Sequence, residues 1–129
     1  MLAVDTNIVV RYLTRDHPQQ ARRAKQLIDE NDVFVATTVL LETEWVLRSA
    51  YGQSRAEIAE AVGAFIGLPH VTLEDSVLAA KALDWFASGM DFADAVHLAG
   101  TGDCEAFLTF DRRLVMVARR VGETSVRAP

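Results

Sequence analysis

Residues 1–13 read MLAVDTNIVVRYL, and this stretch places an acid directly after a short apolar run. Leu2 to Val4 is predicted to be a buried strand, and Asn7 to Leu13 is predicted to begin a helix. In open parallel α/β sheets the ligand crevice lies outside the carboxyl ends of the strands. The sequence therefore predicts that Asp5 lies at the ligand-binding edge of a sheet.

The rest of the chain alternates between strand-like and helix-like segments. Further strands are predicted at DVFVA (32–36) and AFLTF (106–110), with short candidate strands at HVTL (70–73) and TSVRA (124–128). Helices are predicted at residues 18–29, 37–52, 54–66, 74–89, 91–100 and 111–122. Alternation of this kind indicates an α/β sandwich with a central, mostly parallel sheet.

Local signals mark several of the helix ends. Pro18 fits the first turn of a helix, and Ser54 with Glu57 forms a capping-box pattern. Glycines are predicted to close three of the helices, at positions 52, 89 and 100.

The composition fits one globular domain spanning residues 1–129, with 50% hydrophobic residues. A single cysteine, Cys104, excludes an intramolecular disulfide framework and predicts a reducing, cytoplasmic location. The longest apolar stretch, 33–47, contains two glutamates and is too short to span a membrane. The net charge of −5 argues against a broad basic surface for nucleic acid. It does not exclude a nuclease whose bound cations reverse the local charge.

Two aspartates follow predicted strands in equivalent places. Asp5 follows the first strand and Asp111 follows the strand at 106–110, so both are predicted to open onto one sheet edge. Each has a small hydroxyl residue nearby, Thr6 or Thr109. The alternative is that each aspartate is only a helix N-cap.

Two glutamates on the predicted helix 37–52 are expected to differ in role. Glu42 shares helical spacing with Val39, Trp45 and Val46, so we expect it to point inward, where a lone carboxylate needs a partner or a metal. Glu44 lies four residues before Arg48, the favourable order for an exposed ion pair. The sequence therefore favours Glu42 as the functional acid of the two.

Asp91 and Asp94 lie one helical turn apart at the start of the predicted helix 91–100. Asp91 is a candidate N-cap, and Asp94 is predicted to point into the crevice. A purely structural capping arrangement is the alternative.

A common site made of Asp5, Glu42, Asp94 and Asp111 would offer only hard oxygen ligands. Zinc is disfavoured because no cluster of cysteine and histidine is present, whereas Mg²⁺ or Mn²⁺ fits carboxylate oxygens. One or two such ions support phosphodiester hydrolysis. We expect in-line attack by an activated water that leaves a 5′-phosphate and a 3′-hydroxyl.

Four stretches together resemble the signature blocks of the PIN-domain ribonucleases, and most closely those of VapC-like toxins of bacterial toxin–antitoxin modules. The stretches are VDTNIVVRYL, TTVLLETEWVLR, DFADAVHLA and FLTFDRRL. The resemblance runs from residue 1 to about residue 114, in the order of the family.

The resemblance implies a Rossmann-like α/β/α sandwich and Mg²⁺ or Mn²⁺ bound by an acidic cluster. By position it assigns the catalytic and metal-binding acids as Asp5, Glu42, Asp94 and Asp111. It assigns supporting positions to Thr6, Asn7, Asp91 and Thr109. It also implies an RNA substrate, a homodimer and a small antitoxin whose tail covers the active site.

Arginines cluster in two stretches, near the predicted N-terminal helices and just after Asp111. They are Arg11, Arg15, Arg22, Arg23, Arg112 and Arg113. Those at 11, 15, 112 and 113 are predicted to contact RNA phosphates, and the alternative is an ordinary solvated helix face.

Three other functions compete with a ribonuclease toxin. A phosphatase with an aspartate nucleophile needs a second aspartate where Asn7 stands. A non-catalytic binding module on the same fold would not need all four acids. A PIN nuclease that processes RNA or cuts DNA remains the third alternative.

Overall fold

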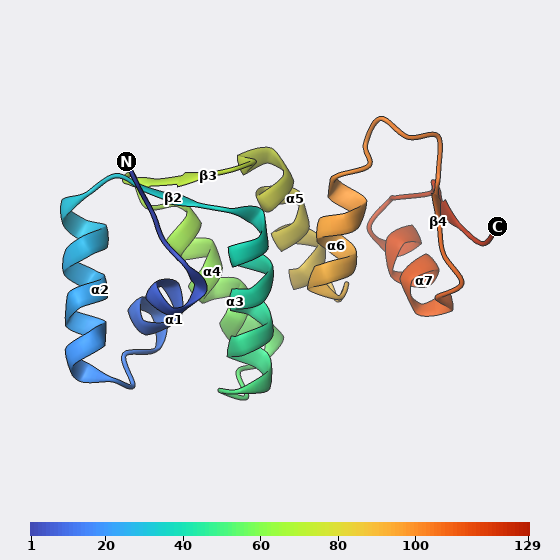
Figure 1. Cartoon of the computed structure of the whole chain (residues 1–129). Helices are drawn as coiled ribbons and strands as arrows, with labels where there is room; N and C mark the ends of the chain where they lie inside the picture. The colour runs from blue at the N-terminus through green and yellow to red at the C-terminus, as the bar shows by residue number, and fades with distance from the viewer. The chain divides into compact units, whose positions relative to one another are not determined.

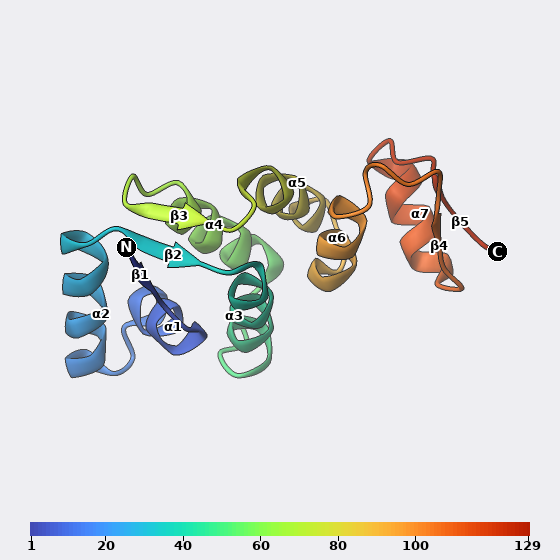
Figure 2. The ribbon, with the colours of Figure 1, turned by 45° about the horizontal axis from the view of Figure 1, so that its top comes forward.

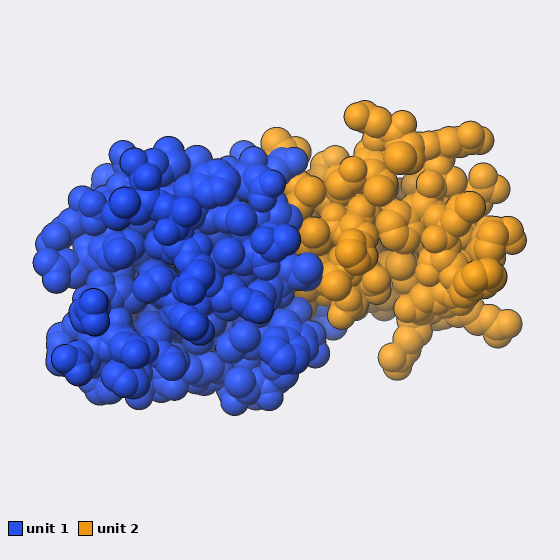
Figure 3. All heavy atoms as spheres, in the orientation of Figure 1, with its two compact units in different colours: residues 1–76 blue, residues 77–129 orange.

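The computed structural model describes all of residues 1–129, which form two compact units, 1–76 and 77–129 (Figure 3). One domain over the whole chain stays a prediction. None of the helices is long and apolar enough to cross a membrane.

Unit 1 contains a three-stranded parallel sheet in the order β1-β2-β3. The strands are β1 (Leu2–Ala3), β2 (Val33–Val35) and β3 (Val71–Leu73). Leu2 pairs with Val33, and Val33 pairs in turn with Val71. The candidate strand at 70–73 is thus confirmed as an edge strand, and the central strand buries Val33 and Val35 completely.

Four helices connect and follow these strands. They are α1 (Thr6–Thr14), α2 (Pro18–Glu30), α3 (Thr37–Ser49) and α4 (Arg55–Ile66). Figures 1 and 2 show all four on one side of the sheet. This follows from the strand order, because right-handed crossovers that advance in one direction keep their helices on the same face.

Large apolar side chains fill the space between these helices and the sheet. Helices α2, α3 and α4 contribute fully buried side chains: Ile28, Leu47, Ile58 and Phe65. Helix α1 contributes Val9, also fully buried, and the ring of Tyr12, whose centroid lies 5.8 Å from that of Phe65. Burial of side chains of this size contributes about 1.5–3 kcal/mol each.

The predicted helix starts in unit 1 are confirmed, whereas one predicted end is wrong. Pro18 opens α2, and the Ser54–Glu57 capping box opens α4 with both reciprocal hydrogen bonds present. Helix α3 ends at Ser49 instead of extending to Gly52. Gly52 has a positive φ of 61°, which glycine adopts easily, and it turns the chain after the helix has ended.

Unit 2 contains two parallel strands, two complete helices and all but the first residue of a third helix. The elements are α5 (Ser76–Ala87), which starts at the last residue of unit 1, α6 (Phe92–Ala99), β4 (Phe107–Leu108), α7 (Arg112–Arg120) and β5 (Val126–Arg127). Phe107 pairs with Val126 and Leu108 with Arg127. Leu114 and Ala118, one helical turn apart on α7, are buried. Every strand pair in both units is parallel, as the sequence predicted.

Candidate metal and nucleic-acid site

Asp5 stands between β1 and α1 and caps the helix. Its Oδ1 accepts a hydrogen bond from the Ile8 backbone N–H at 3.3 Å. Thr6 beside it is buried, and Asn7 is exposed. Asp5 is therefore an N-cap as well as the acid after the first strand, and its role in a metal site stays a prediction.

Asp111 occupies the corresponding place between β4 and α7. Its Oδ1 accepts from the backbone N–H groups of Arg113 at 2.9 Å and Leu114 at 3.2 Å. The Thr109 hydroxyl accepts a hydrogen bond from the Asp111 backbone N–H at 3.0 Å. Thr109 thus holds the turn that carries Asp111, and its supporting role in a functional site stays a prediction.

Asp91 and Asp94 open helix α6. Asp91 is the N-cap, and its Oδ2 accepts from the Asp94 backbone N–H at 3.1 Å. The Asp94 carboxyl is half-buried, and this burial is the largest cause that raises its pKa. The charges of Asp91 and Asp111 raise the pKa further, and His97 partly offsets them. Unit 2 therefore brings Asp94 into the electric field of two other carboxylates.

The structure corrects the predicted orientation of the two glutamates on α3. Glu42 is exposed, and Trp45 on the same face is 57% exposed. Glu44 is the buried one, with 3% of its surface accessible, and it accepts from Arg48 Nε at 2.8 Å. The predicted ion pair between Glu44 and Arg48 is confirmed. The prediction that the Glu44 carboxylate is exposed is wrong.

The reason is that α3 has apolar residues on two faces. The face that packs into unit 1 carries Leu40, Thr43, Glu44 and Leu47, at spacings of three and four. The Thr43 hydroxyl is satisfied within the helix, because it donates to the Val39 carbonyl at 2.7 Å. Two polar residues on this face are therefore accommodated by partners within the helix, and spacing alone does not reveal that they are buried.

The four predicted acids are divided evenly between the units. Asp5 and Glu42 belong to unit 1, and Asp94 and Asp111 belong to unit 2. Neither unit by itself holds three or more acidic, histidine or cysteine side chains placed to bind a metal ion. Each of the four side chains offers carboxylate oxygens, the donors that Mg²⁺ and Mn²⁺ prefer. The pKa of Asp94 is raised first by burial and then by the charges of Asp91 and Asp111, and a bound cation would relieve the repulsion between these carboxylates.

The arginines predicted to contact RNA differ in their surroundings. Arg112 and Arg113 are exposed at the start of α7, and Arg15 is exposed at the C-terminal end of α1. Arg11 is engaged within unit 1: its Nη1 contacts Asp16 at 3.3 Å and donates to the Tyr51 hydroxyl at 2.9 Å. Arg11 thus also ties the α1–α2 connection to the end of α3.

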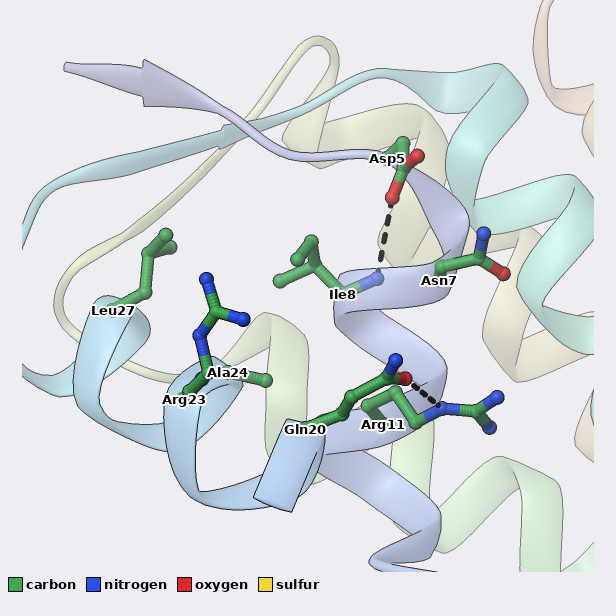
Figure 4. Close-up of a pocket in the computed structure, with 8 residues that line it drawn as sticks. All are labelled: Asp5, Asn7, Ile8, Arg11, Gln20, Arg23, Ala24 and Leu27. Carbon is green, nitrogen blue, oxygen red and sulfur yellow. Dashed lines mark hydrogen bonds between the residues drawn. The ribbon is translucent and has the colours of Figure 1, made fainter. Parts of the chain in front are cut away.

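A pocket of about 480 Å³ lies between α1 and α2, next to Asp5 (Figure 4). Its lining includes Asp5, Ile8, Arg11, Gln20, Arg23 and Leu27. The prediction of site residues did not include the α2 positions. Their signal is helical spacing, because Gln20, Arg23 and Leu27 follow one another at intervals of three and four.

Parallel strands alternating with helices, with an aspartate after both β1 and β4, define an α/β protein of Rossmann-like class. A family model described as the PIN domain matches residues 2–120, which include parts of both units. The chain belongs to the PIN-domain family. PIN domains are generally nucleases and typically use divalent metal ions. A comparison with curated proteins gives no significant match.

Proposed function

We propose that this PIN-domain protein is an Mg²⁺- or Mn²⁺-dependent endoribonuclease and the toxin of a toxin–antitoxin pair. The observation that carries the proposal is the setting of Asp94 in unit 2, where burial and then the charges of Asp91 and Asp111 raise the pKa of its carboxyl. A folded chain that keeps such charges together gains most when a cation binds them. Nuclease activity on a nucleic acid follows from the family, and RNA is the substrate that we propose.

In the proposed site Asp5, Glu42, Asp94 and Asp111 would hold the cation. When bound, the cation supplies charge neutralisation at the phosphate and lowers the pKa of a water. The residues around the acids fix their directions: Asp91 holds the first turn of α6, and Thr109 holds the turn before α7. Asn7 and Thr6 would support Asp5 from the same turn. Preorganised acids of this kind avoid reorganisation when charge develops on the phosphate.

Exposed arginines would guide RNA to these acids. Arg112 and Arg113 directly follow Asp111 and are exposed, so their guanidinium groups are free to contact phosphates beside it. Arg15, which is also exposed, would do the same on the side of Asp5, and Arg11, whose charge is partly neutralised by Asp16, would contribute less. The net charge of −5 means that binding depends on such local groups rather than on the whole surface.

We propose that the partners are a second copy of the chain and a small antitoxin that covers the site. The large apolar side chains of residues 57–68 and 76–87 are buried or half-buried, with the exception of Val77, which is exposed. Apolar residues near Asp111 are more exposed, with Phe110 at 90% and Met116 at 69%. An antitoxin that shields the acids would cover these side chains as well.

The nuclease proposal is tested with purified protein and a structured RNA labelled at its 5′ end. We expect cleavage to internal products that carry 5′-phosphates when Mg²⁺ or Mn²⁺ is present, and no cleavage in EDTA. Restoring excess Mn²⁺ should restore the products, which separates chelation from denaturation. Cleavage that persists unchanged in EDTA would contradict a metal-dependent mechanism.

The toxin role is tested by controlled expression in bacteria. We expect growth to stop after induction of the wild-type chain and to continue after induction of Asp94→Asn at equal protein level. Sequencing of RNA ends after induction identifies the cleaved RNA. If wild type cleaves RNA in vitro but growth is unaffected, a processing nuclease replaces the toxin as the better assignment.

A further inference from the structure

We propose that the pocket between α1 and α2 binds one nucleotide of single-stranded RNA, with the phosphate on Arg23 and Gln20. This inference rests on the proposed function and adds a substrate-binding site to it. The pocket volume of about 480 Å³ lies within the range of about 300–1,000 Å³ for small-ligand sites. It also borders Asp5, one of the proposed metal-binding acids.

Arg23 presents a positive charge that no other side chain of the chain neutralises. Its side chain makes no hydrogen bond or ion pair with another residue of the chain. Figure 4 shows its guanidinium between the Leu27 and Ile8 side chains, directed toward the end of α1 that carries Asp5. A guanidinium in such a place is suited to binding a phosphate through two parallel hydrogen bonds.

A second donor lies one turn earlier on the same helix. Arg11 Nε donates to Gln20 Oε1 at 2.8 Å, which fixes the direction of the Gln20 amide. Because the oxygen is occupied by Arg11, the amide nitrogen remains available as a donor. Gln20 and Arg23 thus provide two neighbouring donors on α2, and this arrangement favours an anion.

The surroundings of Arg11 explain why Arg23 is the main phosphate contact. The charge of Arg11 is partly neutralised by Asp16, which also accepts from Tyr51 at 2.8 Å. The pKa of Asp16 is lowered by the hydrogen bonds from Tyr51 and Thr14 and by the charge of Arg11, so this partner remains ionised at neutral pH. Arg11 therefore acts as a positioning residue for Gln20, and Arg23 supplies the unpaired charge.

The apolar part of the pocket favours a nucleotide over a free phosphate. Ile8 and Leu27 line it on either side of Arg23. A ribose or an unpaired base can lie against these side chains only when it is not enclosed in a duplex, so the ligand is single-stranded. A phosphate on Arg23 would direct the adjacent phosphodiester along α1 toward Asp5.

The test compares Arg23→Ala with Arg22→Ala, its neighbour, which is exposed and does not line the pocket. Binding of a fluorescent single-stranded oligoribonucleotide is measured by anisotropy in EDTA at several salt concentrations. We expect Arg23→Ala to weaken binding about tenfold. For this variant the slope of log K against log salt concentration should become shallower by about 0.7, the value for one phosphate contact on a single strand. Arg22→Ala should match wild type, and Arg23→Lys should retain part of the affinity.

Cleavage assays with Mn²⁺ separate this inference from the proposed function. For Arg23→Ala we expect KM to rise about tenfold while kcat stays within about twofold. If wild type cleaves RNA and Arg23→Ala behaves like Arg22→Ala, the proposed nucleotide pocket is contradicted and the nuclease proposal is not. If wild type binds RNA through Arg23 without cleaving it, the nucleotide pocket is supported and the nuclease proposal is contradicted. Inorganic phosphate that competes as well as AMP would overturn the role of Ile8 and Leu27.

Discussion

Asp94→Asn should slow RNA cleavage by orders of magnitude and at the same time raise the melting temperature of the metal-free protein at pH 7. Burial and the charges of Asp91 and Asp111 raise the pKa of Asp94 in the folded chain above its unfolded value. The folded state therefore binds this proton more tightly, and the resulting stabilisation is present at acidic pH. It is lost as pH rises through the folded pKa, so at pH 7 the ionised carboxylate is unfavourable. Asparagine removes that charge and keeps the shape.

Addition of Mn²⁺ should reverse the order of the two proteins. A cation that binds only the folded state raises the free energy of unfolding, and the increase grows with the logarithm of the ratio of cation concentration to Kd. We expect wild type to bind the cation more tightly than the variant. Turnover of the variant should fall by a factor on the order of 10² to 10³, as expected when a preorganised electrostatic group is lost. Differential scanning fluorimetry with EDTA or Mn²⁺, at pH 7 and at acidic pH, measures the first effect.

Asp103→Asn is the control, because Asp103 is an exposed loop acid of the same unit. It should leave the melting temperature and the turnover unchanged under every condition. If Mn²⁺ stabilised Asp94→Asn as much as wild type, Asp94 would not be a ligand of the cation.

Features that depend on neighbouring residues in the chain were predictable. The capping box of Ser54 and Glu57 and the N-cap of Asp91 are formed within one helical turn, so sequence spacing identifies them. The same is true of Asp5 and Asp111, whose places after strands follow from the alternation of apolar runs and helix starts. These local rules also determined the parallel α/β class.

Features that depend on packing between elements were not predictable from periodicity. Spacing shows which residues of α3 share a face, but not which face meets the β2 side chains. Glu44 is buried because Leu40 and Leu47 pack into the core of unit 1 on its face, and its carboxylate keeps a partner by reaching Arg48. The pocket beside Arg23 escaped prediction for the same reason, since it exists only where α1 and α2 face one another.

A matched pair of variants on α3, Glu42→Gln and Glu44→Gln, should separate activity from stability. Glu42 is exposed, so its replacement should change the free energy of unfolding by less than about 0.5 kcal/mol. As a proposed metal-binding acid it should lower turnover by a factor on the order of 10² to 10³. Glu44 is buried and bonded to Arg48, so its replacement should cost about 1 to 2 kcal/mol of stability. Half of the Arg48 side chain is exposed, which keeps this cost below that of a fully buried pair.

Urea unfolding and cleavage assays on the same preparations measure the two effects. Glu44→Gln should lower the urea midpoint at an unchanged slope, while turnover per folded molecule remains near that of wild type. Glu42→Gln should keep the midpoint and lose turnover, and it should also lose the stabilisation that Mn²⁺ gives to wild type. The same loss of turnover in both variants, at equal folded fractions, would contradict the separation of a functional Glu42 from a structural Glu44. Loss of turnover in Glu44→Gln alone would assign the active-site acid to the buried position, and Glu42 would then be an ordinary surface residue.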